Sequence, residues 1–209
     1  MINLVEFQKE KVQELLNLSV KNLNSNNRPK TIIFQSPTGS GKTIMASELI
    51  KELYKNEKNI SFIWIAPRNL YEQSKIKLQK YLSSSPSITH SYFNDLDKHI
   101  KSGEILYMNW ESINKKDKNI IVQESEKNFF LQKIVENTIE EGNKIVLLID
   151  ESHHGAKSDI SLSLIRSMMP SLTIEISATP KLLELEPGSV EYDIVKAHLA
   201  EVKEANLIK

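Results

Sequence analysis

The segment from Thr31 to Thr43 constrains the fold more than any other part of this 209-residue chain. Residues 31–35 read Thr-Ile-Ile-Phe-Gln, a short β-branched run of the kind that makes a buried strand. Residues 36–43 read Ser-Pro-Thr-Gly-Ser-Gly-Lys-Thr, and apolar residues at helical spacing follow over residues 44–53. A strand that passes through a glycine-containing loop directly into a helix predicts an α/β fold.

The rest of the chain continues this alternation. Further strands are predicted at residues 60–66, 104–108, 144–149 and 172–177, and helices at 12–23, 68–82, 129–141 and around 161–168. Residues 144–149 form a nearly continuous apolar run, which indicates a central parallel strand covered on both faces. The charged residues 115–127 have no clear period and are predicted to form a loop or surface insertion.

The loop after the first strand has the chemistry of a phosphate-binding P-loop. Its glycines let backbone N–H groups turn toward a phosphate, and the following helix adds the positive end of its dipole. Lys42 is expected to reach the β- and γ-phosphates, and the Thr43 hydroxyl to bind Mg²⁺. ATP with Mg²⁺ is therefore the expected cofactor. The residues expected to surround it are Thr38, Gly39, Ser40, Gly41, Lys42 and Thr43.

The strict P-loop pattern has glycine at its first position, where this chain has Ser36. An ordinary glycine-rich turn before a helix is the alternative. The order Gly39-x-Gly41-Lys42-Thr43 between a strand and a helix is specific enough to favour phosphate binding.

An acidic pair ends the most apolar predicted strand. Asp150 and Glu151 follow residues 144–149, and the carboxyl ends of parallel strands are where α/β sheets bind ligands. Asp150 is expected to hold Mg²⁺, and Glu151 to orient and deprotonate the attacking water. The catalytic set predicted is thus Lys42, Asp150 and Glu151. The alternative is a pair of solvated acids at the end of a strand.

Two histidines and a Ser-Ala-Thr-Pro segment complete the candidate site. His153 and His154 suggest zinc, but the chain has no cysteine and no third ligand stands nearby, so a hydrogen-bonding relay is the preferred role for His153. Ser177 and Thr179 follow the last predicted strand and are expected within reach of His153, coupling the acidic pair to a strand groove. The alternative is that both residues only cap the end of the strand.

Composition narrows the class of protein. The chain has no cysteine, no signal-like start and no apolar run long enough for a membrane span, so a soluble cytoplasmic protein is expected. Its 27 basic and 27 acidic residues cancel. Because nucleic-acid binders usually carry a basic excess, this balance argues against tight nucleic-acid binding by the chain alone.

Four segments occur in an order that resembles motifs I, Ia, II and III of the DEAD/DEAH-like superfamily 2 helicases. They are residues 39–43 (Gly-Ser-Gly-Lys-Thr), 66–70 (Ala-Pro-Arg-Asn-Leu), 150–153 (Asp-Glu-Ser-His) and 177–179 (Ser-Ala-Thr). Gln8, placed after Phe7 and ahead of the first predicted helix, resembles the glutamine with which that superfamily reads adenine. The resemblance implies a RecA-like P-loop NTPase domain, with a parallel sheet covered by helices on both faces.

Within that superfamily, four further segments are similar to the Res subunit of type III restriction enzymes. They are residues 109–111 (Asn-Trp-Glu), the helix ending at 141–142 (Glu-Gly), residues 150–156 (Asp-Glu-Ser-His-His-Gly-Ala) and residues 173–180 (Thr-Ile-Glu-Ile-Ser-Ala-Thr-Pro). The closing residues 204–209 also resemble the point where that family leaves its first motor domain.

The resemblance implies a division of the molecule and a set of partners. Residues 1–209 are expected to form one N-terminal RecA-like ATP-binding domain, with a short helical region at 1–29, and a second RecA-like domain lies outside this chain. DNA and a modification (methyltransferase) subunit are the other expected partners. The residues expected to contact nucleic acid are Pro67, Arg68, Asn69, Asn109 and Trp110, although Trp110 has core packing as an equal alternative.

The sequence leaves three functions open. The preferred one is the motor domain of a DNA-dependent ATPase, a helicase or translocase from a restriction or repair enzyme. An RNA-directed helicase is the second, because these motifs do not distinguish DNA from RNA. A nucleotide-binding module that never hydrolyses ATP is the third, and the presence of Glu151 argues against it.

Overall fold

A computed structural model describes residues 3–27, 30–109, 131–150, 165–182 and 191–208 of the chain. The helices are α1 (Glu6–Leu23), α2 (Lys42–Asn56), α3 (Arg68–Tyr81), α5 (Leu131–Glu140), α8 (Leu199–Glu204) and the 3₁₀ turn η1 (Phe93–Asp95). The strands are β1 (Thr31–Gln35), β2 (Ile60–Ala66), β3 (Thr89–Tyr92), β4 (Glu104–Asn109), β5 (Lys144–Asp150), β6 (Leu172–Ser177) and β7 (Tyr192–Lys196).

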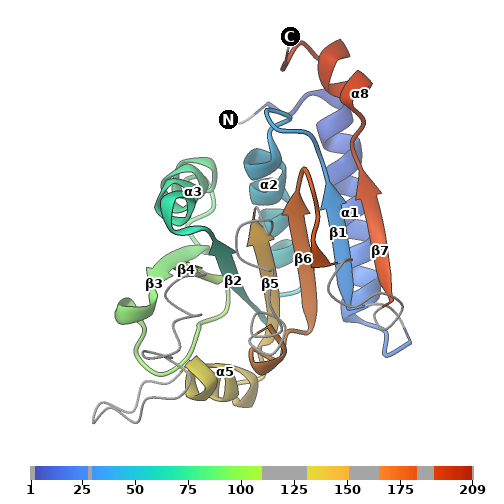
Figure 1. The fold of residues 1–209 in the computed structure, drawn as a ribbon. Coiled ribbons are helices and arrows are strands. Elements are labelled where there is room, and N and C mark those ends of the chain that lie inside the picture. Colours follow the sequence, from blue (N-terminus) through green and yellow to red (C-terminus); the bar gives the residue numbers. More distant parts are fainter. Residues whose placement is uncertain (1–2, 28–29, 110–130, 151–164, 183–190, 209) are drawn as a thin grey trace.

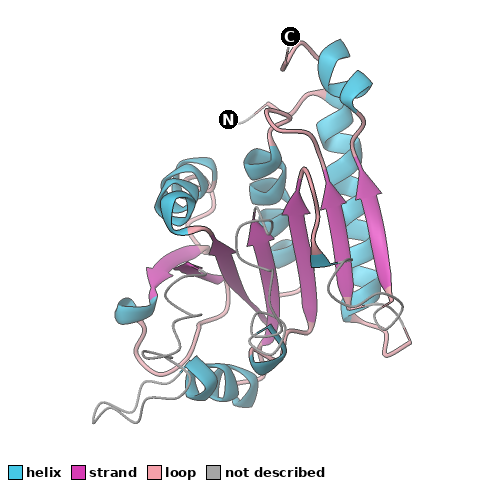
Figure 2. Ribbon diagram, in the orientation of Figure 1, coloured by secondary structure: helices cyan, strands magenta, loops and turns pink. Residues whose placement is uncertain are grey.

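The seven strands form one sheet in the order β3-β4-β2-β5-β6-β1-β7, and every described pairing is parallel. The predicted α/β class and all five predicted strands are therefore confirmed. Because the strands are parallel, their carboxyl ends share one edge, toward which the arrowheads of β5, β6, β1 and β7 point in Figure 2.

Helices cover both faces of the sheet, as predicted. Alternate residues of β2 face opposite sides: Phe62 and Trp64 pack in the core beneath α1, α2 and α3, while Ile63 and Ile65 pack in a second core with α5. Strand β5 divides in the same way. Since both faces are apolar, the central strands read as continuous apolar runs rather than as alternating patterns. In Figure 1, α1 runs behind β1 and β7.

The sequence does not predict strands β3 and β7, which are the two edge strands of the sheet. In β7 only Val195 is buried, and Ile194, like Tyr192, keeps almost half of its surface exposed. In β3 only Ser91 is buried. An edge strand buries little of its surface, so its sequence need not carry the apolar run that marks a central strand.

The first helix begins earlier than predicted. Helix α1 starts at Glu6, so Gln8 lies in its first turn and not ahead of the helix. The Gln8 side-chain oxygen accepts a hydrogen bond from the Val5 N–H at 3.1 Å, which satisfies one of the unpaired donors of a helix start. This bond and the backbone bond from the Lys9 N–H to the Val5 carbonyl, at 3.1 Å, mark the start of the helix. No helix in the described ranges has both the length and the apolar character to cross a membrane.

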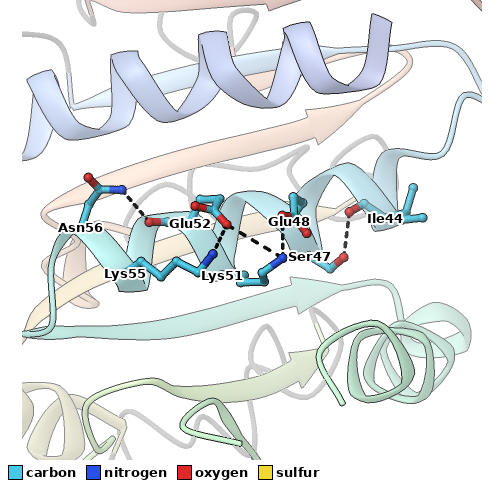
Figure 3. Close-up of polar contacts among 7 residues, drawn as sticks. All are labelled: Ile44, Ser47, Glu48, Lys51, Glu52, Lys55 and Asn56. Atoms are coloured by element: carbon cyan, nitrogen blue, oxygen red, sulfur yellow. Dashed lines mark hydrogen bonds and ion pairs between the residues drawn. The ribbon is translucent and has the colours of Figure 1, made fainter. Parts of the chain in front are cut away.

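The solvent face of α2 is stabilised by its own side chains (Figure 3). Lys51 pairs with Glu48 at 2.7 Å, and Lys55 pairs with Glu52, both three residues apart on the helix. Each such pair contributes about 0.2–0.5 kcal/mol. The pairs support the helix whose first turn carries the P-loop lysine and threonine.

Candidate nucleotide-binding site

The predicted motifs converge at the carboxyl edge of the sheet. The P-loop follows β1, Asp150 is the last residue of β5, and Ser177 is the last residue of β6. Strands β5, β6 and β1 are consecutive neighbours in the sheet. Segments more than a hundred residues apart in the chain therefore end side by side.

The P-loop backbone requires its two glycines. Gly39 and Gly41 have φ angles of 85° and 87°, in the left-handed region that side chains disfavour, and Gly41 is the N-cap of α2. A Cβ on Gly41 would lie 2.5 Å from the Gln8 amide nitrogen, and one on Gly39 would lie 2.7 Å from Ile208. Both positions are thus restricted by backbone conformation and by close packing.

Ser36 fits the position where the strict pattern has glycine. Met169 and Asn206 are the non-glycine residues of the described ranges with positive φ, so the backbone at Ser36 does not demand glycine. The Ser36 hydroxyl is buried, 2.6 Å from the Ser40 hydroxyl across the loop. The serine therefore closes the P-loop with a side-chain hydrogen bond, which glycine does not offer.

Lys42 lies over the loop, largely buried. Its ammonium donates to the carbonyl oxygens of Ser36 and Pro37, each at 3.4 Å. These distances are at the long end for a hydrogen bond, whereas a charge-assisted bond to a phosphate oxygen is shorter and stronger. The lysine is thus placed to exchange these two weak contacts for phosphate.

A pocket of about 430 Å³ joins the P-loop to the acidic strand end, and we call it the phosphate-loop pocket. Lys42, Thr43 and Asp150 all line it. Asp150 keeps only 8% of its surface exposed, and its Oδ2 accepts a hydrogen bond from the Ser74 hydroxyl at 3.3 Å. A carboxylate and a hydroxyl on one pocket are oxygen ligands that suit Mg²⁺.

The described residues contain no cluster of three or more histidine, cysteine, aspartate or glutamate side chains that could hold a metal alone. Mg²⁺ is usually bound through one or two carboxylates together with substrate phosphates. The donor set of Thr43 and Asp150 beside a phosphate loop therefore fits Mg²⁺ that arrives with a nucleotide.

Helix α3 forms a wall of the phosphate-loop pocket that the sequence motifs do not predict. Its lining residues are Leu70, Gln73, Ser74, Lys77 and Tyr81. These residues follow one another at intervals of three, one, three and four positions, so they lie on one face of the helix. This helical spacing is visible in the sequence. Nothing local indicated that this face turns toward Asp150.

Gln8 is placed against the P-loop. Its side chain is buried, and its amide nitrogen donates to the Ser40 carbonyl at 2.8 Å. The predicted contact with adenine stays a prediction, since the described bonds of this side chain go to Ser40 and Val5.

Ser177 is fully buried, and its hydroxyl accepts a hydrogen bond from the Thr179 N–H at 3.1 Å. The Ser177 carbonyl also accepts from the Ser36 N–H at 3.1 Å, and the Gln35 side chain donates to the Ala178 carbonyl at 3.4 Å. The turn after β6 is thus hydrogen-bonded directly to the start of the P-loop. No sequence pattern predicts this contact.

The remaining predicted residues divide into two groups. Pro67 is buried and directly precedes α3, which begins at Arg68 and Asn69, while Asn109 ends β4 at the same edge of the sheet. Five predicted features lie outside the described residues, in whole or in part: Glu151, His153, Trp110, the predicted loop at 115–127 and the first half (161–164) of the predicted helix at 161–168, whose residues 165–167 are helical.

The model of the family described as "Type III restriction enzyme, res subunit" matches residues 1–182. No curated protein matches the chain.

Solved structures share the fold at low sequence identity. The type ISP restriction-modification enzyme LlaGI, solved with a DNA substrate mimic, has a TM-score of 0.63 at 12% identity, covering 99% of this chain and 21% of that one. The Sulfolobus solfataricus SWI2/SNF2 ATPase core with dsDNA has 0.58 at 13%, covering 86% and 32%. The DUF1998 helicase MrfA bound to DNA has 0.58 at 19%, covering 93% and 27%.

This chain thus spans about a third or less of each of those solved chains. The matched family covers most of its length and includes the P-loop, the acidic strand end and the Ser-Ala-Thr turn. The chain belongs to the type III restriction enzyme res subunit family.

Proposed function

We propose that this domain hydrolyses ATP with Mg²⁺ to drive movement along DNA, as the first RecA-like half of a longer motor of the Res type. The observation that carries the proposal is the convergence of Lys42, Thr43 and Asp150 on one pocket at the carboxyl edge of the sheet. Phosphate-binding cation, hydroxyl and carboxylate are the groups that phosphoryl transfer requires in one place.

Each residue has a distinct chemical role in this proposal. Lys42 holds the β- and γ-phosphates, while Thr43 and Asp150 hold the metal, with Ser74 orienting the Asp150 carboxylate through its hydroxyl. Bound Mg²⁺ would neutralise charge on the phosphate oxygens. Glu151, the next residue after Asp150, takes a proton from the attacking water.

The proposal includes partners beyond this chain. A second RecA-like domain would close the nucleotide cleft and supply arginine side chains, which contribute about 10³- to 10⁵-fold in rate in other phosphoryl-transfer enzymes. DNA is the preferred track because LlaGI, the SWI2/SNF2 core and MrfA were each solved with DNA. The proposal also includes a methyltransferase subunit as a partner and a cytoplasmic location.

Nucleotide binding and hydrolysis by the isolated domain test whether the nucleotide site is shared with a second domain. The isolated chain is expected to bind ATP or ADP with Mg²⁺ weakly and to hydrolyse ATP slowly, because half of the site belongs to the second domain. Titration calorimetry and phosphate release measure the two quantities. Brisk turnover by a verified monomer of 209 residues would contradict the two-domain proposal.

The nucleic-acid track is tested in the intact protein. Duplex DNA is expected to stimulate ATP hydrolysis more than RNA of equal length does. Greater stimulation by RNA would favour the RNA helicase alternative, and ATP binding without any hydrolysis would favour the silent nucleotide-binding module.

Ser177 and Thr179 are proposed to couple hydrolysis to movement. Their turn is bonded to the start of the P-loop through backbone groups, which Ser177→Ala with Thr179→Ala leaves in place. The double variant is expected to keep most DNA-stimulated ATP hydrolysis and to lose translocation, measured as displacement of a triplex-forming strand.

A buried serine away from the edge supplies the control for this variant. Ser47 lies in α2, where its hydroxyl also makes a local bond, to the Ile44 carbonyl at 2.7 Å. Ser47→Ala should leave both activities unchanged. A proportional fall of hydrolysis and translocation in the double variant would leave Ser177 and Thr179 with only the capping role.

A further inference from the structure

A second pocket opens at the carboxyl edge of the sheet, on the far side of β2 from the P-loop. It has a volume of about 390 Å³, and we call it the aromatic pocket. Its lining residues include four aromatic and two polar ones: Tyr71, Tyr92, Phe93, Tyr107, Asp95 and Asn109. None of these aromatic residues takes part in the nucleotide site described above.

The aromatic rings are held in fixed positions. The Tyr71 and Tyr92 rings pack edge to face with centroids 5.9 Å apart, and the Lys75 ammonium lies 3.3 Å from the centre of the Tyr92 ring. Tyr107 is buried, and its hydroxyl lies 2.9 Å from Nδ1 of His90, whose ring stacks on it. Burial lowers the pKa of His90 to about 4, so the imidazole that stacks on Tyr107 is uncharged at neutral pH.

The charge around the pocket disfavours phosphate and favours a neutral ring. Asp95 lines the pocket, and the Tyr71 hydroxyl donates to the Glu72 carboxylate at 3.2 Å. The nearby cation, Lys75, is engaged with the Tyr92 ring and is itself largely buried. An anion would meet the Asp95 carboxylate here, whereas a neutral planar ring would meet the partly exposed rings of Tyr71 and Phe93.

The polar groups of the pocket suit the edge of a nucleobase. Asn109 lines the pocket, and its amide carries both donors and an acceptor. Single-stranded nucleic acids are bound by stacking of unpaired bases on aromatic side chains, with hydrogen bonds to the base edges.

The position of the pocket places it beside the proposed backbone contacts. Asn109 is paired in register with Ala66, the residue before Pro67, and Tyr71 lies in the first turn of α3, which starts at Arg68. A strand whose sugar-phosphate backbone runs along residues 67–69 would therefore bring its bases close to Tyr71 and Asn109.

We propose that the aromatic pocket binds one unstacked nucleobase of a single strand, so that the domain contacts a base as well as the backbone. The proposal rests on the proposed function only in requiring that nucleic acid reaches this edge of the domain. Aromatic stacking is tolerant of base identity, so the pocket favours single strands over duplex without reading sequence.

The test compares strands that differ only in their bases. Binding of the intact protein, without ATP, is measured by fluorescence anisotropy with oligothymidylate and with an abasic strand of the same length and charge. Oligothymidylate is expected to bind roughly tenfold more tightly, the effect of one stacked base. Oligouridylate should share this advantage if the base, rather than the sugar, is recognised.

Two substitutions at Phe93 locate the effect in the pocket. Phe93 is half-buried, and Phe93→Leu retains apolar volume while removing the aromatic face. This variant should lower the preference for bases to about twofold or less, while Phe93→Tyr should keep it. Tyr54 is an aromatic control outside the pocket: a lysine ammonium lies 4.3 Å from the centre of its ring, and its hydroxyl lies 3.3 Å from that of Ser102 in the turn before β4. Tyr54→Leu should leave the preference intact.

Equal binding of the oligothymidylate and abasic strands by the wild-type protein would overturn the pocket assignment. So would a loss of affinity in Phe93→Leu that is the same for both strands. Either result leaves DNA-stimulated ATP hydrolysis untouched as the separate test of the motor function, so the two proposals fail independently.

Discussion

Lys42→Ala is expected to lower the affinity for ATP and ADP roughly a hundredfold and so to abolish hydrolysis at ordinary nucleotide concentrations. The substitution removes the cation that lies over the P-loop, largely buried beside the carbonyls of Ser36 and Pro37. Loss of one partner from a desolvated charge pair costs about 2–5 kcal/mol, which corresponds to between 30- and several-thousandfold in affinity. Calorimetric titration with Mg²⁺-ADP measures the change directly.

The control for Lys42→Ala is a lysine of the same helix that lies outside the pocket. Lys55 keeps 55% of its side chain exposed and pairs with Glu52 on the solvent face of α2. Lys55→Ala removes the same charge, and exposed pairs contribute little, so nucleotide affinity should stay within about twofold. If both variants lost affinity equally, the effect of Lys42 would be one of net charge and not of phosphate contact.

Glu151→Gln is expected to separate binding from chemistry. Glutamine keeps the size of the side chain and loses its basicity, so Mg²⁺-ATP should bind with unchanged affinity while hydrolysis falls about 10²- to 10⁴-fold, the usual contribution of a general base. Nucleotide affinity and single-turnover phosphate release in the intact protein give the two numbers. Lys42→Ala should show the opposite behaviour, because it lowers the affinity for the nucleotide itself.

Glu140→Gln is the matched control for the acidic substitution. Glu140 is the last residue of α5 and is exposed, so the same chemical change there should alter neither quantity. A parallel loss of ATP affinity and hydrolysis in Glu151→Gln would show that Glu151 holds the nucleotide or the metal, and the role of general base would have to be reassigned.

The sequence by itself determined the central part of this fold and the identity of its phosphate loop. Residues 60–66 and 144–149 are apolar at nearly every position because each strand has both faces covered by helices. The burial of each strand is therefore visible in its own sequence. The P-loop is equally local: Gly39 and Gly41 are required by the backbone conformation of the loop that contains them.

The edge strands β3 and β7 have few buried side chains, so they lack the apolar run by which a strand is recognised. The start of α1 includes a hydrogen bond between Gln8 and Val5, which apolar spacing does not record, so apolar spacing alone does not place Gln8 inside the helix.

Tertiary structure alone decided which distant residues meet. Ser74 reaches Asp150 across 76 positions of sequence, the Ser177 carbonyl bonds the Ser36 N–H, and Tyr71 and Asn109 converge on the aromatic pocket. Each meeting depends on the order of strands in the sheet and on the face that α3 turns toward it. Strand order is set by the packing of the whole core, in which every strand and helix buries its apolar surface at once, so no single segment of the sequence records it.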